Sequence, residues 1–200
     1  MPRLRSFAWV SWLAVFAQSA AAATIWSESV NGDLSGNRLV PTNLGVLAVG
    51  TNTILGSTIS GDLDYFTFTV PAGASFTQMN LAAYGASNPA FIAIQAGAVF
   101  TEAPATVNPA NLHGYMHPGP SHVGTDVLDN MAGSNLLFPA AQGFSVPLGP
   151  GSYAFWVQQT NPTPSSYTWD VVVVPEPTTV ALLGFGLGAL ALARRRAAHR

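Results

Sequence analysis

Two aspartates, Asp62 and Asp64, stand two residues apart directly before an alternating aromatic run, and this spacing suits them to bind a cation. Side chains two residues apart in an extended segment project to the same side. That side also carries Phe66 and Phe68, which we expect to face the core, and a carboxylate facing a core needs a partner. Ca²⁺ is a suitable partner because it takes about six to eight oxygen ligands from carboxylates and carbonyls. In the alternative interpretation, both aspartates only accept hydrogen bonds from N–H groups of a turn. The ligands of the predicted calcium site are Asp62, Asp64, Glu28, Asn31 and Asp33.

The histidines His113, His117 and His122 form a second group of candidate metal ligands. An H-x3-H pair binds zinc best on a helix, where both rings lie on one face, but the glycine and prolines around these histidines argue against a helix. A loop zinc site completed by Asp126 or Asp129 would make the protein a metal-dependent hydrolase, and solvated loop histidines are the alternative. The sequence has no cysteine or lysine nucleophile and no G-x-S-x-G motif. We therefore predict that the protein is not an enzyme and keep the hydrolase as the third hypothesis.

Two aromatic residues, Trp156 and Tyr115, are candidates for binding sugar rings. In the strand expected at 153–159, Trp156 has the opposite parity to Tyr153 and Phe155, so it belongs to the outer face. Aromatic faces combine apolar area with a polar group, which suits sugar rings. Either the two residues form an exposed platform for an exopolysaccharide, or a long loop covers Trp156.

The elements that position these residues have the pattern of an all-β protein. Short runs rich in β-branched and aromatic residues alternate with clusters of glycine, proline and asparagine. Apolar–polar alternation within the runs indicates sheets with one buried face, and two such sheets must pack together. We therefore predict an antiparallel, jelly-roll-like β-sandwich over residues 24–174. The predicted strands are 25–29, 46–49, 53–60, 63–70, 76–84, 91–95, 153–159 and 167–174.

The region 101–150 interrupts this pattern with seven prolines and many glycines. We expect long irregular loops there, with an irregular strand near 136–138. Loops of this length are usually functional or mobile, so this region is a good place to look for a site.

Both ends of the chain have the features of sorting signals. Arg3 and Arg5 precede an apolar stretch and a small-residue cleavage site, so residues 1–23 are predicted to be a signal peptide handled by the Sec translocon and signal peptidase. The apolar run 178–193 would form a transmembrane helix of about 24 Å, which is short for a bilayer core of about 30 Å. The basic tail 194–200 favours the cytoplasmic side. The alternatives are an uncleaved N-terminal anchor and a permanent C-terminal anchor.

The distribution of charge excludes several partners. Six of the seven arginines lie at the two ends, whereas the segment 24–177 holds Arg38 and all nine carboxylates. The net charge of this segment is therefore one minus nine, or −8. Nucleic-acid binding needs several cations against the phosphates, so the sequence predicts no nucleic-acid partner. Bound cations, in contrast, fit this composition.

The C-terminal end resembles the PEP-CTERM sorting signal of Gram-negative bacteria. The resemblance rests on the order of a short motif, an apolar run and a basic tail over residues 175–200 and the residue before them. It implies that exosortase, a membrane enzyme, recognises and removes the tail while the helix is transiently anchored in the inner membrane, and that the protein then reaches the cell surface or the extracellular polymer. The matching residues are Val174, Pro175, Glu176, Pro177, Arg194, Arg195 and Arg196.

A second resemblance covers most of the central domain. Residues 61–73 carry D-x-D-x-F, alternating apolar residues and P-x-G, and residues 149–158 carry a G-x-Y strand; both are similar to the pre-peptidase C-terminal type of bacterial β-sandwich. This resemblance implies an accessory, non-catalytic module that aids secretion or attaches to polymers and sometimes holds calcium. We therefore predict an exported, non-catalytic surface or extracellular-matrix protein. The alternative is a calcium-assisted glycan-binding module of the exopolysaccharide matrix.

Overall fold

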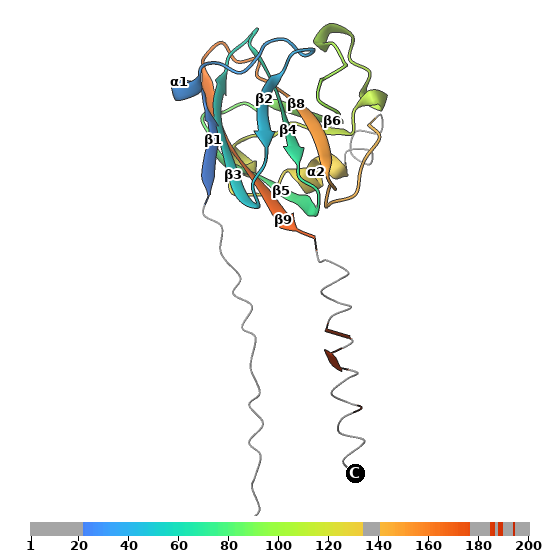
Figure 1. Cartoon of the computed structure of the whole chain (residues 1–200). Coiled ribbons are helices and arrows are strands. Elements are labelled where there is room, and N and C mark those ends of the chain that lie inside the picture. The colour runs from blue at the N-terminus through green and yellow to red at the C-terminus, as the bar shows by residue number, and fades with distance from the viewer. Residues whose placement is uncertain (1–21, 134–140, 177–184, 187, 190–193, 195–200) are drawn as a thin grey trace, which may run out of the picture.

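The computed structural model describes residues 22–133 and 141–176, together with positions 185, 186, 188, 189 and 194. Two β-sheets pack face to face and form a sandwich (Figure 1). The strands of the four-stranded sheet are, in order, β1 (Ala23–Ser27), β3 (Gly50–Thr58), β9 (Ser165–Pro175) and β5 (Ala74–Tyr84). Those of the five-stranded sheet are β2 (Thr42–Val46), β4 (Leu63–Val70), β8 (Gly151–Gln158), β6 (Phe91–Ala96) and β7 (Gly114–Met116). The connections contain the helices α1 (Glu28–Asn31) and α2 (Leu128–Ala132) and the 3-10 turns Pro104–Thr106, Pro109–Asn111 and Pro120–His122.

The prediction of two packed sheets is confirmed, but the prediction that all strands pair antiparallel is wrong at two edges. β1 pairs with β3 and β2 pairs with β4 in parallel. The first four strands alternate between the sheets, and the chain reverses its direction at each crossing. Every second strand therefore runs the same way, and β1 and β3 become parallel neighbours. The remaining pairs are antiparallel.

Most predicted strands lie within a few residues of their expected positions. β2 occurs before the expected 46–49, because its sequence Thr-Asn-Leu-Gly-Val lacks a clear alternation. β7 is too short to show a period at all. The expected irregular strand near 136–138, most of the predicted signal peptide and most of the apolar run 178–193 lie outside the described residues.

The described residues contain no helix with the length and apolar character needed to span a bilayer.

The main core lies between the sheets and is built from alternating side chains. Phe66 and Phe68 of β4 point inward beside Phe155 of β8, with ring centroids 5.1 Å apart in both pairs. Phe76 of β5 meets Phe68 edge to face from the opposite sheet. All four rings are fully buried, and each contributes roughly 1.5–3 kcal/mol by leaving water. This packing fixes which residues of β4 face inward, and Asp64 is among them.

A second cluster covers the outer face of the five-stranded sheet. Tyr65 and Trp156 are cross-strand partners there, and Phe100 and Leu112 pack over them. The region 101–133 is therefore more ordered than predicted: it contributes β7 to the sheet edge, and α2 packs against both β5 and β7. Burial of both faces explains why β4 and β8 are almost continuously buried rather than alternating.

Candidate functional site

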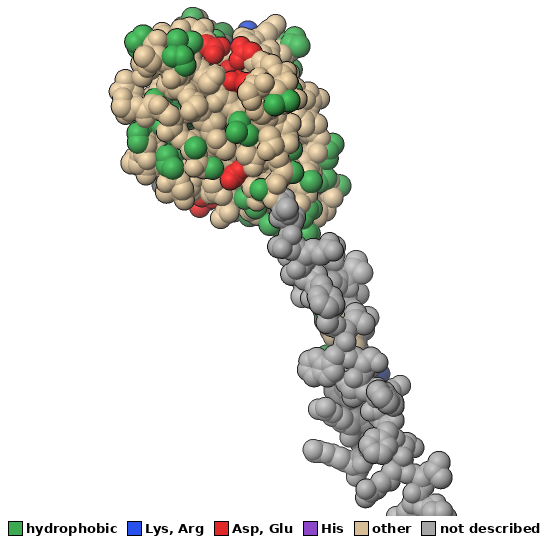
Figure 2. Space-filling view, turned by 90° about the vertical axis from the view of Figure 1, so that its left-hand side faces the viewer, with side chains coloured by type: hydrophobic (Ala, Val, Ile, Leu, Met, Phe, Trp, Pro, Cys, Tyr) green, Lys and Arg blue, Asp and Glu red, His purple; other side chains and the backbone are tan. Residues whose placement is uncertain are grey.

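Three carboxylates gather at one end of the sandwich. β1 begins and β9 ends at the lower end in Figure 1, whereas α1, the β1–β2 connection and the β3–β4 connection lie at the upper end. Figure 2 shows acidic side chains together at this upper end. Three carboxylates, those of Glu28 of α1, Asp33 of the β1–β2 connection and Asp64 of β4, each place an oxygen within 4.8 Å of the others. We call these three residues the acidic cluster.

Asp64 is the buried member of the acidic cluster. Its side chain has no exposed surface, and its Oδ2 accepts a hydrogen bond of 2.6 Å from the hydroxyl of Tyr167. Because Asp64 belongs to β4 and Tyr167 to β9, this bond joins the two sheets. The other oxygen, Oδ1, is buried without a hydrogen-bond partner. A buried carboxylate oxygen in this state strongly favours a bound proton or cation.

Glu28 is held in place by the end of β3. Its Oε2 accepts hydrogen bonds from Ser57 N at 2.7 Å and from Ser57 Oγ at 3.0 Å. Its Oε1 accepts a longer bond of 3.5 Å from Leu34 N. A recess of about 360 Å³ beside Glu28 extends to Tyr167, so a hydrated ion can approach this part of the cluster.

The electrostatics of the acidic cluster disfavour full ionisation. Burial raises the pKa of Asp64 to about 8; the hydrogen bond from Tyr167 opposes this shift, and the charges of Glu28, Asp62 and Asp33 add to it. Burial also raises the pKa of Glu28 and that of Asp62, and in both cases the charge of Asp33 contributes. Each of these shifts has the sign expected for carboxylates that crowd together away from water.

The only arginine between residues 22 and 176 does not point its charge at a carboxylate of the cluster. Arg38 donates hydrogen bonds to the backbone oxygens of Phe100 and Thr101. Ca²⁺ is a suitable counter-ion for the acidic cluster. Its oxygen ligands lie at about 2.3–2.6 Å from the ion, so two oxygens that bind the same ion lie up to about 5 Å apart. The separations in the acidic cluster fall within this limit.

The structure brings together three of the five predicted calcium ligands. Asp62 is close enough for its charge to raise the pKa of Asp64. Asn31 Oδ1 accepts a hydrogen bond of 3.0 Å from Ser27 N, which engages this oxygen in the turn of α1. Sequence reasoning missed Tyr167 as a partner of Asp64, although its parity with Trp169 places it on the inner face. Calcium itself stays a prediction.

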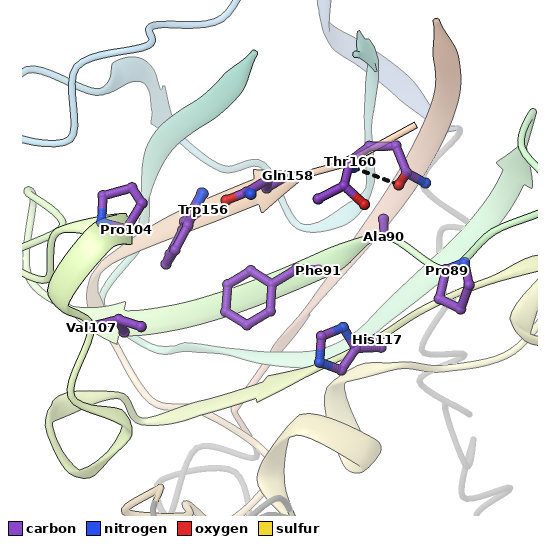
Figure 3. Close-up of a pocket in the computed structure, with 10 residues that line it drawn as sticks. Pro89, Ala90, Phe91, Pro104, Val107, His117, Trp156, Gln158 and Thr160 are labelled. Carbon is purple, nitrogen blue, oxygen red and sulfur yellow. Dashed lines mark hydrogen bonds between the residues drawn. The ribbon is translucent and has the colours of Figure 1, made fainter. Parts of the chain in front are cut away.

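A second candidate site is a recess of about 330 Å³ on the outer face of the five-stranded sheet (Figure 3). The ring of Phe91 lies at its centre, between Trp156 and His117. Phe91 and Trp156 meet edge to face, with ring centroids 4.6 Å apart. The lining is mostly apolar and carries no carboxylate or arginine; it consists of Pro89, Ala90, Phe91, Pro104, Val107, His117, Trp156, Gln158, Gln159 and Thr160.

The structure decides between the two interpretations of Trp156. Only 3% of its surface is exposed, so it does not form an open platform, and the alternative in which a loop covers it is the one observed. Tyr115 occupies the same row of the sheet, because Ala93 pairs with both residues, and Phe91 packs against both rings. Phe91 is the residue that sequence reasoning missed; its parity with Ala93 in the predicted strand 91–95 was the available signal.

The three histidines take separate positions. His113 and His117 flank β7, and four residues of extended strand separate them by about 13 Å, too far for both to bind one zinc ion. His113 Nδ1 is hydrogen-bonded to Gln142 Oε1, and His122 Nδ1 accepts a hydrogen bond from Gly119 N. Asp126 accepts from the N–H groups of Met79 and Leu128. Among the described residues, the group of carboxylate and histidine side chains close enough to share an ion is the acidic cluster.

The start of the predicted sorting motif belongs to the sandwich. β9 continues through Pro175, which pairs with Ala74 of β5. Glu176 N donates a hydrogen bond of 2.8 Å to Gly73 O, and Ser75 Oγ donates one of 3.0 Å to the Glu176 carboxylate. The segment is therefore extended and is hydrogen-bonded to the β4–β5 turn and to the start of β5.

The described chain is thus a mostly-β sandwich whose last strand runs directly into a candidate sorting signal. Residues 173–197 match the PEP-CTERM protein-sorting motif, which marks an exported protein that exosortase sorts to the cell surface. Among solved structures, the chain is similar to the pre-peptidase C-terminal domain of collagenase from Bacillus anthracis, with 18% sequence identity and a TM-score of 0.35 over 66% of this chain and 92% of that chain. No curated protein matches the sequence.

Proposed function

We propose that this protein is an exported, non-catalytic component of the cell surface or extracellular matrix, and that its C-terminal signal is removed during sorting. The observation that carries this proposal is the PEP-CTERM match at residues 173–197, which begins inside β9. A stable sandwich joined to a removable tail is an arrangement suited to placing a folded module outside the cell.

Mass spectrometry of the protein released by its native host tests this proposal. We expect a mature chain that starts near Thr24, ends close to Glu176 and lacks Arg194–Arg196. The same analysis in cells without exosortase should recover the basic tail, because its removal depends on that membrane enzyme. A released protein that keeps both original ends in cells with active exosortase would contradict the proposal.

Calcium binding by the acidic cluster is part of the proposed function. Support comes from the unpartnered Oδ1 of buried Asp64, from the convergence of three carboxylates and from the recess beside Glu28. An ion there would join α1, the β1–β2 connection and β4, and would neutralise the charge that now destabilises this end. Since the cluster bridges both sheets through Tyr167, calcium would act as a structural ligand.

The recess around Phe91 supports a second candidate function, the binding of a neutral glycan in the extracellular polymer. Aromatic and proline side chains form much of its lining, and Gln158 and Thr160 add an amide and a hydroxyl group to it. Such a lining, apolar with a few polar groups, is typical of sites for small neutral ligands. The net charge of −8 disfavours acidic polysaccharides at low salt.

Affinity electrophoresis in gels containing dextran, a neutral polysaccharide, tests the second candidate. We expect retardation of the wild type, and a loss of at least about half of the retardation in Gln158→Ala, because one hydrogen-bonding group contributes about 0.5–1.5 kcal/mol. Gln78→Ala is the matched control, since Gln78 is exposed on β5 of the other sheet. Equal retardation of all three proteins, or migration unchanged by dextran, would remove this candidate for a dextran-like ligand.

A further inference from the structure

The glutamate of the sorting motif is already bound by the domain that it follows. The Glu176 N–H donates a hydrogen bond to Gly73 O, and the Glu176 carboxylate accepts one from Ser75 Oγ. Ser75 is 7% exposed and lies on β5, the edge strand of the four-stranded sheet.

The turn that makes these contacts is well defined. Gly73 has φ +75°, a conformation that glycine adopts without strain and other residues rarely adopt. Ala74 N donates to Pro71 O across the turn at 3.2 Å. The Gly73 oxygen and the Ser75 hydroxyl are therefore presented to Glu176 by a preformed structure.

An enzyme that binds an extended peptide uses the backbone groups and side chains of that peptide. The N–H and carboxylate of Glu176 cannot bond to the β4–β5 turn and to such an enzyme with the same geometry. Release of the last residues of β9 must come first. The effective rate of processing is then the rate for the released motif multiplied by the fraction of time that the motif is released. Ends of strands open locally at low free energy, so the contact slows processing without preventing it.

We propose that the β4–β5 turn holds Glu176 through Gly73 and Ser75, and that the sorting enzyme acts only on a motif released from this turn. The proposal rests on the proposed function, because it assumes that exosortase processes the tail. It assigns to Ser75, a residue outside the sorting signal, control over the rate of sorting. A fully folded domain therefore delays its own release from the membrane.

The test compares Ser75→Ala with Thr77→Ala in the full-length protein, expressed in host cells with active exosortase. Thr77 is a matched control because its hydroxyl donates to Val172 O, also on β9 but before the motif, at 3.3 Å. Loss of one hydrogen bond predicts a three- to tenfold faster processing of Ser75→Ala in a pulse-chase experiment, about the range of one net hydrogen bond. Thr77→Ala should stay within about twofold of the wild type.

Hydrogen exchange of the Glu176 amide in the solubilised full-length protein gives a readout that is independent of exosortase. It should accelerate in Ser75→Ala and stay unchanged in Thr77→Ala. Unchanged exchange, or processing of Ser75→Ala at or below the wild-type rate, overturns the proposal. If the wild type is not processed while exosortase cleaves another substrate, the proposed function fails instead, and hydrogen exchange alone then decides whether Ser75 holds Glu176.

Discussion

In the absence of calcium, replacement of Asp64 by asparagine is expected to raise the melting temperature at pH 7 by about 8–16 °C. Asparagine keeps the size of the side chain and an acceptor for the Tyr167 hydroxyl, but it carries no charge. To fold at pH 7, the wild type must either bury a carboxylate with an unpartnered oxygen beside Glu28 and Asp33, or take up a proton that the unfolded chain has released. Asparagine removes this cost, which is on the order of 4 kcal/mol at pH 7, and a domain of this size gains about 2–4 °C per kcal/mol.

The pH dependence of this effect follows from the raised pKa of Asp64, about 8 in the folded protein against 3.8 as the ordinary value. Between these two values the folded state binds a proton that the unfolded state has released. The stability of the wild type in EDTA should therefore be greatest near pH 4 and fall by about 1.4 kcal/mol per pH unit toward pH 8. The raised pKa values of Glu28 and Asp62 act in the same direction. Asp64→Asn should match the wild type near pH 4 and exceed it at pH 7.

Calcium should reverse the order of the two proteins. The wild type should gain stability on addition of millimolar CaCl2, because the ion binds only the folded cluster, whereas Asp64→Asn should not respond. Asp129→Asn is the control, since Asp129 is an exposed residue of α2 outside the cluster. Melting curves followed by circular dichroism, with EDTA or CaCl2 at several pH values, measure all of these differences. A variant that is less stable than the wild type at every pH would show that Asp64 is well paired, contrary to our account.

The second large effect is expected from Gly56→Ala, which should lower the melting temperature by about 4–10 °C. Gly56 pairs with Tyr167 across β3 and β9, and a Cβ atom there would overlap the Tyr167 ring. That ring is 2% exposed, and its hydroxyl is bonded to Asp64, so it cannot move away freely. Overpacking of this kind typically costs about 1–3 kcal/mol. The displaced ring would also release Asp64 and weaken the calcium response.

Gly149→Ala provides the comparison for Gly56→Ala. Its Cβ would have no neighbour within 4 Å, and its backbone lies outside the left-handed region. We expect its melting temperature within about 2 °C of the wild type, because the added methyl group meets only solvent. If Gly56→Ala melts at the temperature of Gly149→Ala, the contact between Tyr167 and β3 does not constrain the cluster.

The sequence was sufficient to predict the sandwich and the core side of β4, because aromatic residues alternate there without interruption. Period-2 parity also placed Asp64 on the inner face, which the structure confirms. Parity could not reveal that Glu28 and Asp33 reach Asp64, since this depends on how the first four strands alternate between the sheets. For the same reason the parallel edges were missed: local patterns contain no information on which sheet a strand joins.

The outer face was harder to predict. Trp156 has the parity of the outward-facing residues, yet Phe100 and Leu112 of the irregular region that follows β6 cover it. Irregular segments lack a period, so the sequence gives no sign of what they pack against. The hydrogen bonds between Glu176 and the β4–β5 turn escaped prediction because they join residues about 100 positions apart.

The strand order β1-β3-β9 places the start of β1 and the end of β9 two strands apart in one sheet. The start of β1 and the end of β9 lie at the same end of the sandwich, with β3 between these two strands. The nine residues of β3 span roughly 30 Å from that end of the sandwich to the opposite end. In a protein attached through β9, as the proposed function has it, the acidic cluster would therefore lie at the end of the domain farthest from the attachment point.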